Sequence, residues 1–283
     1  MKPVRYGAAG QEKPGMIDGS GRLRDLSGML DDITPEQLSD AALGRLGSLD
    51  ASSVPEVTEP CRFAPPVAGI RKFIAIGLNY SDHAQEANMP IPTEPAVFSK
   101  ATSCIAGAND DVMLPFGSTK LDWEVELGVV IGGHARHVRE EDALALVAGY
   151  CVVNGVSERA FQFERGPTWD KGKGCGTFGP IGPWLVIKNE VPDPQSLSLL
   201  LDVNGVRMQD GNTRTMIFLI ARIVSFVSRF ITLQPGDVVT TGTPPGVGLG
   251  IKPVPRFLHE GDVMRLGIEG LGIQQQRVVA FKP

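Results

Sequence analysis

The sequence has few of the residues that build disulfide frameworks, zinc clusters or membrane spans. It contains four cysteines and four histidines in 283 residues, too scattered for a disulfide framework or a zinc cluster. The longest apolar runs, such as residues 147–153, fall well short of the roughly 20 residues of a membrane-spanning helix. Residues 1–6 lead directly into polar, glycine-rich sequence without the apolar core of a signal peptide. We therefore expect a soluble, cytoplasmic protein with reduced thiols.

Charge of one sign is not in large excess, and common cofactor motifs are absent. The sequence has 27 Lys+Arg and 32 Asp+Glu, a net charge of −5, which gives no electrostatic reason to bind nucleic acid or an anionic membrane. It contains no phosphate-binding P-loop, no dinucleotide-binding Gly-x-Gly-x-x-Gly unit and no serine nucleophile elbow. His134 and His137 lack the glutamate of a zinc-protease helix. A nucleotide cofactor is therefore not expected.

Glycine and proline are abundant, with 34 and 22 residues, and predict many turns between short strands. Residues 1–68 read as a small N-terminal α+β domain plus a linker. Short strand signals there are separated by a hairpin signal at residues 18–21. A capping box at residues 34–37, with proline at the first helical position, predicts a helix through about Leu46. The proline-rich residues 48–69 then predict a linker.

Residues 69–283 read as a second, larger domain in which strand and hairpin signals dominate. A buried strand is expected at residues 71–77, and Asn204-Gly205 between two strands is typical of a type I′ turn. Apolar periodicity predicts helices over residues 81–88 and 216–230. The sum is a mixed α/β domain, mainly antiparallel β-sheet.

Two glutamates stand on one face of a predicted strand over residues 122–132. Alternate side chains of a strand share a face, so Glu124 and Glu126 lie together, opposite Trp123, Val125 and Leu127. Two buried carboxylates repel each other unless something positive lies beside them. Carboxylate oxygens suit a hard cation such as Mg²⁺, Mn²⁺ or Ca²⁺. On this pattern alone, a half-exposed strand and a metal site are both open.

A histidine and two glycine-rich segments are further candidates. His83 and Glu86 are three residues apart on a predicted helix, where they can touch. A carboxylate that orients an imidazole can activate water, although the same spacing is typical of a surface ion pair. Lys171-Gly172-Lys173-Gly174 and residues 240–248 read as flexible loops, compatible with simple turns or with ligand sites.

Taken together, these residues resemble the fumarylacetoacetate hydrolase family. The resemblance covers most of residues 70–283, and residues 4–27 are similar to the small N-terminal domain of bacterial members. Among these, the sequence is most similar to the branch that acts on 2,4-diketo-3-deoxy sugar acids, often labelled ureidoglycolate lyase. The matching blocks are residues 76–86, 122–132, 149–159, 171–175 with 179–184, and 241–248.

The resemblance implies a β-roll or sandwich fold and a hydrolase that cleaves a C–C bond in a 2,4-diketo acid. The products would be pyruvate, or a related keto acid, and a carboxylic acid. By the same resemblance, Glu124 and Glu126 hold Mg²⁺ or Mn²⁺ together with an aspartate. His83 and Glu86 activate water, and Lys173 stabilises developing negative charge.

The resemblance extends to substrate binding and to assembly. Thr243 matches a position that binds the substrate carboxylate, and Gln209 is expected to face the same pocket. Members of the family are typically homodimers, so a homodimer is expected here.

The sequence departs from the family pattern at two positions. Gly155 stands where the third metal ligand, an aspartate, is expected, and Gly176 stands where close relatives usually carry aspartate. Three explanations are open: a weak metal site, a substitute carboxylate such as Asp170 or Glu158, or loss of the metal. The alternative functions are a metal-free binding or subunit protein, and an oxaloacetate decarboxylase or tautomerase that uses the same enolate chemistry.

Overall fold

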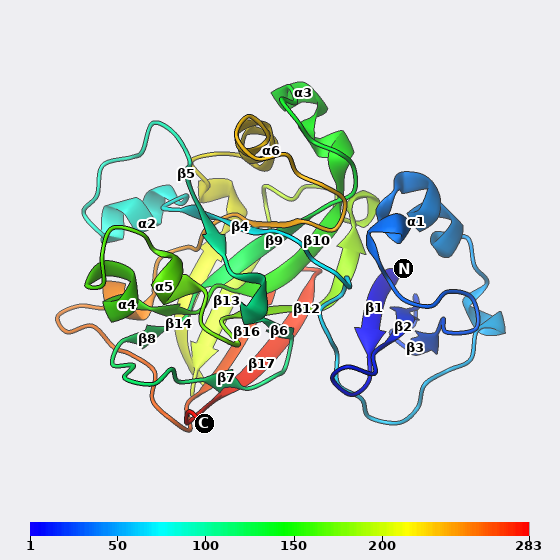
Figure 1. The fold of residues 1–283 in the computed structure, drawn as a ribbon, viewed down its shortest axis with the longest axis horizontal. Helices are drawn as coiled ribbons and strands as arrows, with labels where there is room; N and C mark the ends of the chain where they lie inside the picture. Colours follow the sequence, from blue (N-terminus) through cyan, green and yellow to red (C-terminus); the bar gives the residue numbers. More distant parts are fainter. Residues whose placement is uncertain (283) are drawn as a thin grey trace.

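An antiparallel three-stranded sheet, one short α-helix and two 3₁₀ turns form the N-terminal part of the computed structural model, which describes residues 1–282 (Figure 1). The helix expected from residue 34 is divided in two at Ser39. Its backbone is extended at φ −68° and ψ 151°, and its hydroxyl caps the second segment at Ala42 N–H. The predicted capping box is present. The elements are β1 (Lys2–Tyr6), β2 (Lys13–Ile17), β3 (Leu23–Asp25), a 3₁₀ turn (Pro35–Leu38), α1 (Asp40–Gly47) and a second 3₁₀ turn (Ala51–Ser53).

A seven-stranded sheet is the centre of the larger part of the chain. Its strands follow the order β5-β4-β15-β9-β10-β12-β6. The β4–β15 and β6–β12 pairs are parallel and the others are antiparallel. The strands are β4 (Phe73–Gly77), β5 (Ala96–Lys100), β6 (Ile105–Gly107), β9 (Val125–Ile131), β10 (Val147–Asn154), β12 (Gly179–Ile187) and β15 (Val238–Thr240).

A second sheet of five strands packs against the first through β13, β16 and β17. The order is β14-β13-β16-β17-β7, with β7 parallel to β17. Strands β8 and β11 form a separate two-stranded pair, and β8 directly precedes β9 in the chain. The strands are β7 (Val112–Met113), β8 (Leu121–Asp122), β11 (Ser157–Glu158), β13 (Ser198–Val203), β14 (Val206–Asn212), β16 (Val263–Ile268) and β17 (Gly272–Val279).

Short helices lie around the sheets, with α2, α4 and α5 gathered on one side and α3 and α6 on another (Figure 1). Within the described residues, no helix has the length and apolarity needed to cross a bilayer. The helices are α2 (Ser81–Glu86), α3 (Glu140–Ala143), α4 (Arg159–Phe163), α5 (Asp170–Lys173) and α6 (Ile220–Ser228). The remaining 3₁₀ turns are Thr102–Cys104, Leu144–Leu146, Lys188–Glu190, Thr213–Thr215 and Gly248–Gly250.

The predicted fold class is confirmed: the architecture is mixed α/β, mostly sheet, with a curled half-barrel. One large apolar cluster fills the space between the two sheets and includes Phe73, Trp123 and Phe178. Strand β9, which carries Glu126, runs through this cluster, to which its Val125, Leu127 and Val129 belong. Rigid strands of this kind hold side chains in fixed positions.

Several local predictions are confirmed and others need correction. Asn204 and Gly205 have φ of 52° and 76°, as a type I′ turn requires. The helix expected over residues 216–230 is shorter, running from Ile220 to Ser228. The strand expected over residues 122–132 is interrupted after β8 at Trp123 and Glu124 and resumes as β9. The glycine-rich residues 171–174 are not a flexible loop, because most of them form the single turn of α5.

Candidate active site

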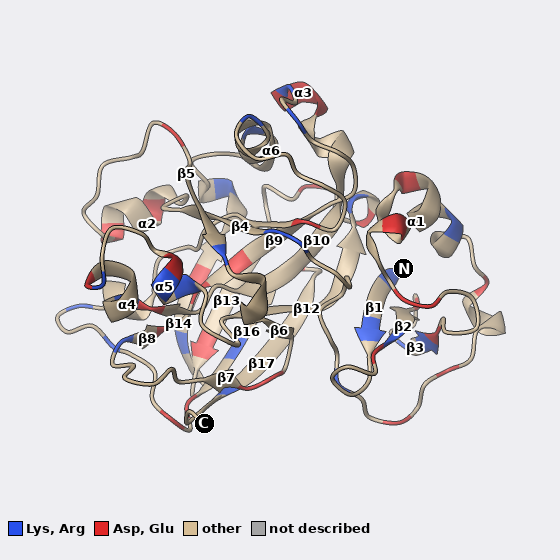
Figure 2. Ribbon diagram, viewed as in Figure 1, with Lys and Arg blue, Asp and Glu red and all other residues tan. Residues whose placement is uncertain are grey.

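Two buried glutamates lie at the N-terminal end of β9, Glu124 just before its first residue and Glu126 within it, where Figure 2 shows acidic segments inside the central sheet. Glu124 and Glu126 are 7% and 3% exposed. A Cβ atom placed on Gly155 would collide with Glu126 Oε1 and lie 3.1 Å from Glu124 Oε2, so both carboxylates face the same space. Every residue of β9 is buried, which rules out the half-exposed strand.

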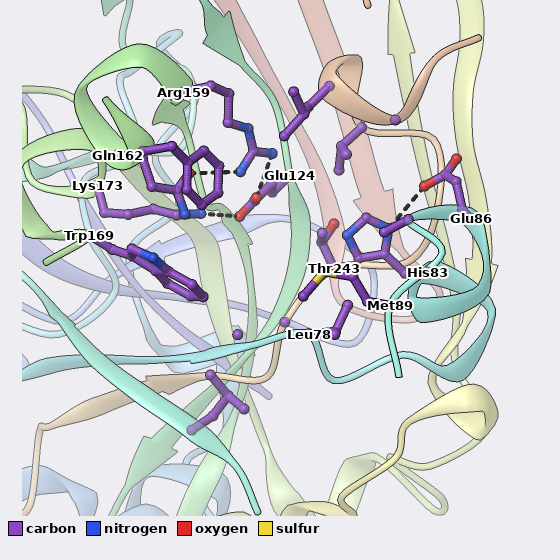
Figure 3. Close-up of a pocket in the computed structure, with 18 of the residues that line it drawn as sticks. Leu78, His83, Glu86, Met89, Glu124, Arg159, Gln162, Trp169, Lys173 and Thr243 are labelled. Atoms are coloured by element: carbon purple, nitrogen blue, oxygen red, sulfur yellow. Dashed lines mark hydrogen bonds and ion pairs between the residues drawn. The ribbon is translucent and has the colours of Figure 1, made fainter. Parts of the chain in front are cut away.

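Two cations neutralise Glu124. Arg159 Nη2 lies 2.8 Å from Oε1, and Lys173 Nζ lies 2.7 Å from Oε2, as the dashed lines in Figure 3 mark. Burial by itself raises the pKa of Glu124, but the charges of Lys173 and Arg159 outweigh it and lower the pKa below the usual range. Glu124 is therefore ionised and bound to two cations.

Arg159 is fixed by a carboxylate that the sequence analysis treated only as part of a motif. Its Nε donates to Asp122 Oδ2 at 2.8 Å, and Nη1 donates to Gln162 Oε1 at 3.1 Å. Asp122 is fully buried and also accepts the N–H groups of Gly248 and Leu249. One carboxylate thus joins the guanidinium to the second glycine-rich segment. Sequence spacing alone gave no sign of this link.

Lys173 reaches the site because α5 packs tightly on α4. A Cβ atom at Gly172 would lie 2.5 Å from both Gln162 N and Glu158 O, so a larger residue there would push the two helices apart. The ammonium of the buried Lys100 donates to Lys173 O at 2.7 Å and holds the end of α5. Burial lowers the pKa of Lys173, while the charge of Glu124 opposes that shift.

Glu126 has a different environment from Glu124. Its Oε2 accepts the N–H of Gly242 at 2.9 Å, and within residues 1–282 it has no ion-pair partner. Burial, and then repulsion by Glu124, raises the pKa of Glu126 above the usual range. The two neighbouring carboxyl groups therefore have pKa values shifted in opposite directions.

His83 and Glu86 form a hydrogen-bonded pair on α2. His83 Nδ1 lies 2.9 Å from Glu86 Oε2, and the other oxygen of Glu86 accepts the N–H of Gly246 at 3.0 Å. The opposite nitrogen of the imidazole faces the interior of the cavity (Figure 3). The carboxylate thus orients the ring so that this nitrogen can meet a bound molecule.

One cavity of about 510 Å³ brings these groups together. His83, Glu86, Glu124, Arg159 and Lys173 all line it, although they come from four separate segments of the chain. The dimensions lie within the usual range for small-molecule sites.

Thr243 lines the cavity and Gln209 lies behind it. The Thr243 hydroxyl donates to Val125 O at 2.9 Å and accepts from Gln209 Nε2 at 2.8 Å. Gln209 is fully buried, donates also to Pro244 O and accepts from Val125 N. The geometry therefore places Gln209 as a support for Thr243, outside the cavity wall.

Comparison with known proteins identifies the family. The model of the fumarylacetoacetate (FAA) hydrolase C-terminal domain matches residues 72–279. The chain belongs to the fumarylacetoacetate hydrolase family. A Burkholderia cenocepacia (strain HI2424) protein, provisionally named a hydrolase, is 60% identical over 277 residues, which are 98% of each chain. The family assignment made from the sequence is thereby confirmed.

Solved structures of the fumarylacetoacetate hydrolase family superimpose over nearly the whole chain. Fumarylacetoacetate hydrolase from Exiguobacterium antarcticum has a TM-score of 0.89 at 34% identity, covering 99% of this chain and all of that one. Maleylpyruvate hydrolase from Sphingobium sp. SYK-6 has a TM-score of 0.82 at 28% sequence identity, again covering 99% of this chain and all of that one. 5-Carboxymethyl-2-hydroxymuconate delta-isomerase from Mycobacterium smegmatis has a TM-score of 0.78 at 29% sequence identity, and the match covers both chains fully. The family thus contains hydrolases and isomerases that act on keto acids.

Fumarylacetoacetate hydrolase family enzymes commonly use a divalent metal, but the side chains here do not fit one. Both oxygens of Glu124 are paired with cations. Glu126 extends into the space above Gly155, the position at which the sequence resemblance predicts a third ligand. Within residues 1–282, no group of three or more histidine, cysteine, aspartate or glutamate side chains could hold a metal ion. The donor set is incomplete without an acidic residue at position 155.

The two candidate substitutes and the second glycine do not complete the set. Asp170 is exposed at the start of α5. Glu158 is buried but accepts N–H groups from Lys120 and Ala160. Gly176 is exposed, and a Cβ atom there would approach nothing closer than Met113 Cε at 3.9 Å. The expectation that Gly176 removes charge next to an ion is therefore wrong, and Gly155 alone borders the two glutamates.

Proposed function

We propose that the protein is a hydrolase that cleaves the C3–C4 bond of a 2,4-diketo acid, releasing a carboxylic acid and pyruvate or a related 2-keto acid. The observation that carries the proposal is the meeting of an oriented imidazole with a buried ammonium and guanidinium in one cavity. Family relatives that act on keto acids support the substrate class.

The reaction begins with water activation by the His83–Glu86 pair. The cavity-facing imidazole nitrogen takes a proton from water as the water oxygen attacks the C4 carbonyl carbon. Glu86, held by the N–H of Gly246, stabilises the resulting imidazolium. The tetrahedral intermediate then collapses, and the electron pair of the C3–C4 bond moves toward C2. The 2-keto acid leaves as its enolate, and the imidazolium returns the proton to C3.

Negative charge that develops on the 2-oxygen needs a positive partner, and we assign this role to Lys173. An ammonium has three N–H donors, and within residues 1–282 one of them binds a side chain, Glu124. The others are available to a substrate oxygen. Arg159 adds a second positive charge held fixed by Asp122. Preorganised cations in a buried site are effective at stabilising an oxyanion.

Thr243 is proposed to contact the substrate carboxylate after its hydroxyl rotates away from Val125 O. The hydrogen bond from Gln209 to the same oxygen can persist during that rotation, because the hydroxyl oxygen accepts it. Gln209 is then a positioning residue for Thr243.

The experiment is hydrolysis of acylpyruvates by protein treated with EDTA. Loss of the diketone absorbance, together with one keto acid formed per substrate consumed, is the expected result. His83→Gln should lower kcat by about 10²-fold or more, whereas His259→Gln, at an exposed histidine outside the cavity, should not change it. Binding of the diketo acid without any turnover would point instead to a binding protein.

An isomerase or tautomerase is the second candidate, because the chain resembles an isomerase along its full length. Such an enzyme would form the same enolate and would need proton transfer by His83 without a water attack. Oxaloacetate decarboxylation would use that enolate as well. Incorporation of ¹⁸O from labelled water into the carboxylic acid product separates hydrolysis from both reactions.

A further inference from the structure

An aromatic wall begins directly beside the ammonium of Lys173. Lys173 Nζ lies 5.5 Å from the centre of the Phe98 ring. Trp169 meets Phe98 edge-on with ring centres 5.3 Å apart, and meets Phe163 edge-on at 6.1 Å. All three rings line the cavity. A substrate held at Lys173 would therefore have aromatic carbon as its immediate neighbour.

The backbone holds the indole of Trp169 in place. A Cβ atom on Gly77, at the end of β4, would lie 2.6 Å from Trp169 Cζ3, so the ring packs directly on the glycine backbone. Trp169 immediately precedes α5, the helix that carries Lys173. The position of the ring relative to the ammonium is thus fixed by one short turn of chain. A rigid ring is a low-entropy contact for a ligand.

The cavity is apolar also on the side of the imidazole. Leu78 and Met89 lie beside His83 (Figure 3), and Met89 and Phe163 are 53% and 52% exposed. Exposed apolar side chains at the edge of a concave site are typical of a surface that receives an apolar group.

The polar side chains around the cavity are largely bound to one another. Gln162 accepts from Arg159, and the hydroxyl of Thr243 has partners on both sides. A polyhydroxylated chain buried here would lose hydrogen bonds to water and find few to replace them, which is costly. An aryl or alkyl group would lose none.

We propose that the preferred substrates carry an aryl or bulky alkyl group on C4, which packs on the Phe98–Trp169–Phe163 wall, in place of the polyhydroxylated chain of a sugar acid. This rests on the proposed function for the identity of the reacting diketo acid. The wall then determines specificity, while the imidazole and the cations act on the part that all such substrates share.

The first measurement compares three substrates that differ only beyond C4. These are 2,4-dioxo-4-phenylbutanoate, 2,4-dioxopentanoate and a 2,4-diketo-3-deoxy sugar acid. We expect kcat/KM for the phenyl compound to exceed that for the methyl compound by roughly 50-fold, and the sugar acid to be the poorest. A preference for the sugar acid, or equal rates with phenyl and methyl, would overturn the proposal while leaving the hydrolase intact.

Two variants test whether the wall causes the preference. Trp169→Ala should reduce the phenyl-to-methyl ratio of kcat/KM by about tenfold. Phe98→Leu, which keeps apolar volume but removes the ring, should reduce it less. Phe230→Ala, at an exposed aromatic residue outside the cavity, is the matched control and should leave the ratio unchanged. An unchanged ratio in both wall variants would refute the role of the rings.

Binding of a ligand that cannot be cleaved tests the role of the aromatic wall independently of whether the protein hydrolyses diketo acids. 4-Phenyl-2-oxobutanoate lacks the C4 carbonyl, and its binding can be compared with that of 2-oxopentanoate by calorimetry. Tighter binding of the phenyl compound, lost in Trp169→Ala, would support the wall even if no diketo acid were hydrolysed. No preference for the phenyl ligand would count against it.

Discussion

Restoring an acidic residue at position 155 should create a metal site that the natural chain lacks. In Gly155→Asp, the new Cβ atom would collide with Glu126 Oε1, so the Glu126 side chain must turn away. Without metal, the variant then holds three neighbouring carboxylates, two of them without a cation. Overpacking of this kind costs about 1–3 kcal/mol, and charge repulsion acts in the same direction.

A bound cation reverses this effect because the new aspartate and Glu126 gain a positive partner, and Glu124 can exchange its bond to Lys173 for one to the metal. A site with a Kd of about 0.1 mM would gain about 2.3 kcal/mol at about 5 mM Mg²⁺. For a chain of 283 residues, that gain corresponds to a rise in Tm of about 4 °C. The natural protein should shift by less than about 1 °C under the same conditions.

The assay is thermal unfolding of both proteins with and without Mg²⁺, and Mn²⁺ binding followed by electron paramagnetic resonance. Gly176→Asp is the matched control, because it adds the same charge in open, exposed space. It should show no shift. Two results would refute the reasoning: an equal shift in the natural protein, or a Gly155→Asp variant that folds normally and binds no Mn²⁺.

The remaining predictions concern the groups around Glu124 and the imidazole. Lys173→Met should lower kcat by about 10²–10³-fold, whereas Lys171→Met, on the exposed side of α5, should change it less than about twofold; equal losses would contradict a role for the ammonium. Glu86→Gln should lower kcat by about 10²-fold or more with little change in KM, and a rise in KM alone would argue against water activation. Arg159→Met leaves Asp122 buried without its cation, which should cost about 3–5 kcal/mol, measured by urea unfolding; an unchanged midpoint would mean that Asp122 needs no partner.

The sequence predicts those parts of the structure that depend on local chemistry. Asn204-Gly205 forms the expected turn because few other pairs accept positive φ at two successive positions. Glu124 and Glu126 face the same space, as the two-residue period of a strand predicts, although Glu124 lies just before β9. His83 and Glu86 touch because one helical turn separates them. Each of these contacts spans only a few residues.

Contacts between distant segments are the part that the sequence could not supply. Nothing in the spacing shows that Asp122 binds Arg159, or that Trp169 packs on Gly77. Such contacts depend on how β4, β9, α4 and α5 come together. Conversely, nearness in sequence does not guarantee a contact: Gly176 is three residues from Lys173 but faces open space. The aromatic wall has no periodic signal, because its rings come from separate segments.

The charges around Glu124 give the glycine at position 155 a physical meaning. Asp122 and Glu124 are matched by Arg159 and Lys173, and burial raises the pKa of Glu126, which favours its neutral form. An aspartate at position 155 would add a buried negative charge without a cationic side chain as its partner. Such a charge destabilises the fold unless a metal ion is bound. With glycine there, the ammonium of Lys173 pairs with Glu124, and in the proposed mechanism its other N–H donors meet the anionic substrate. In the proposed mechanism, the residue at position 155 therefore decides whether a bound cation or Lys173 faces the substrate oxygen.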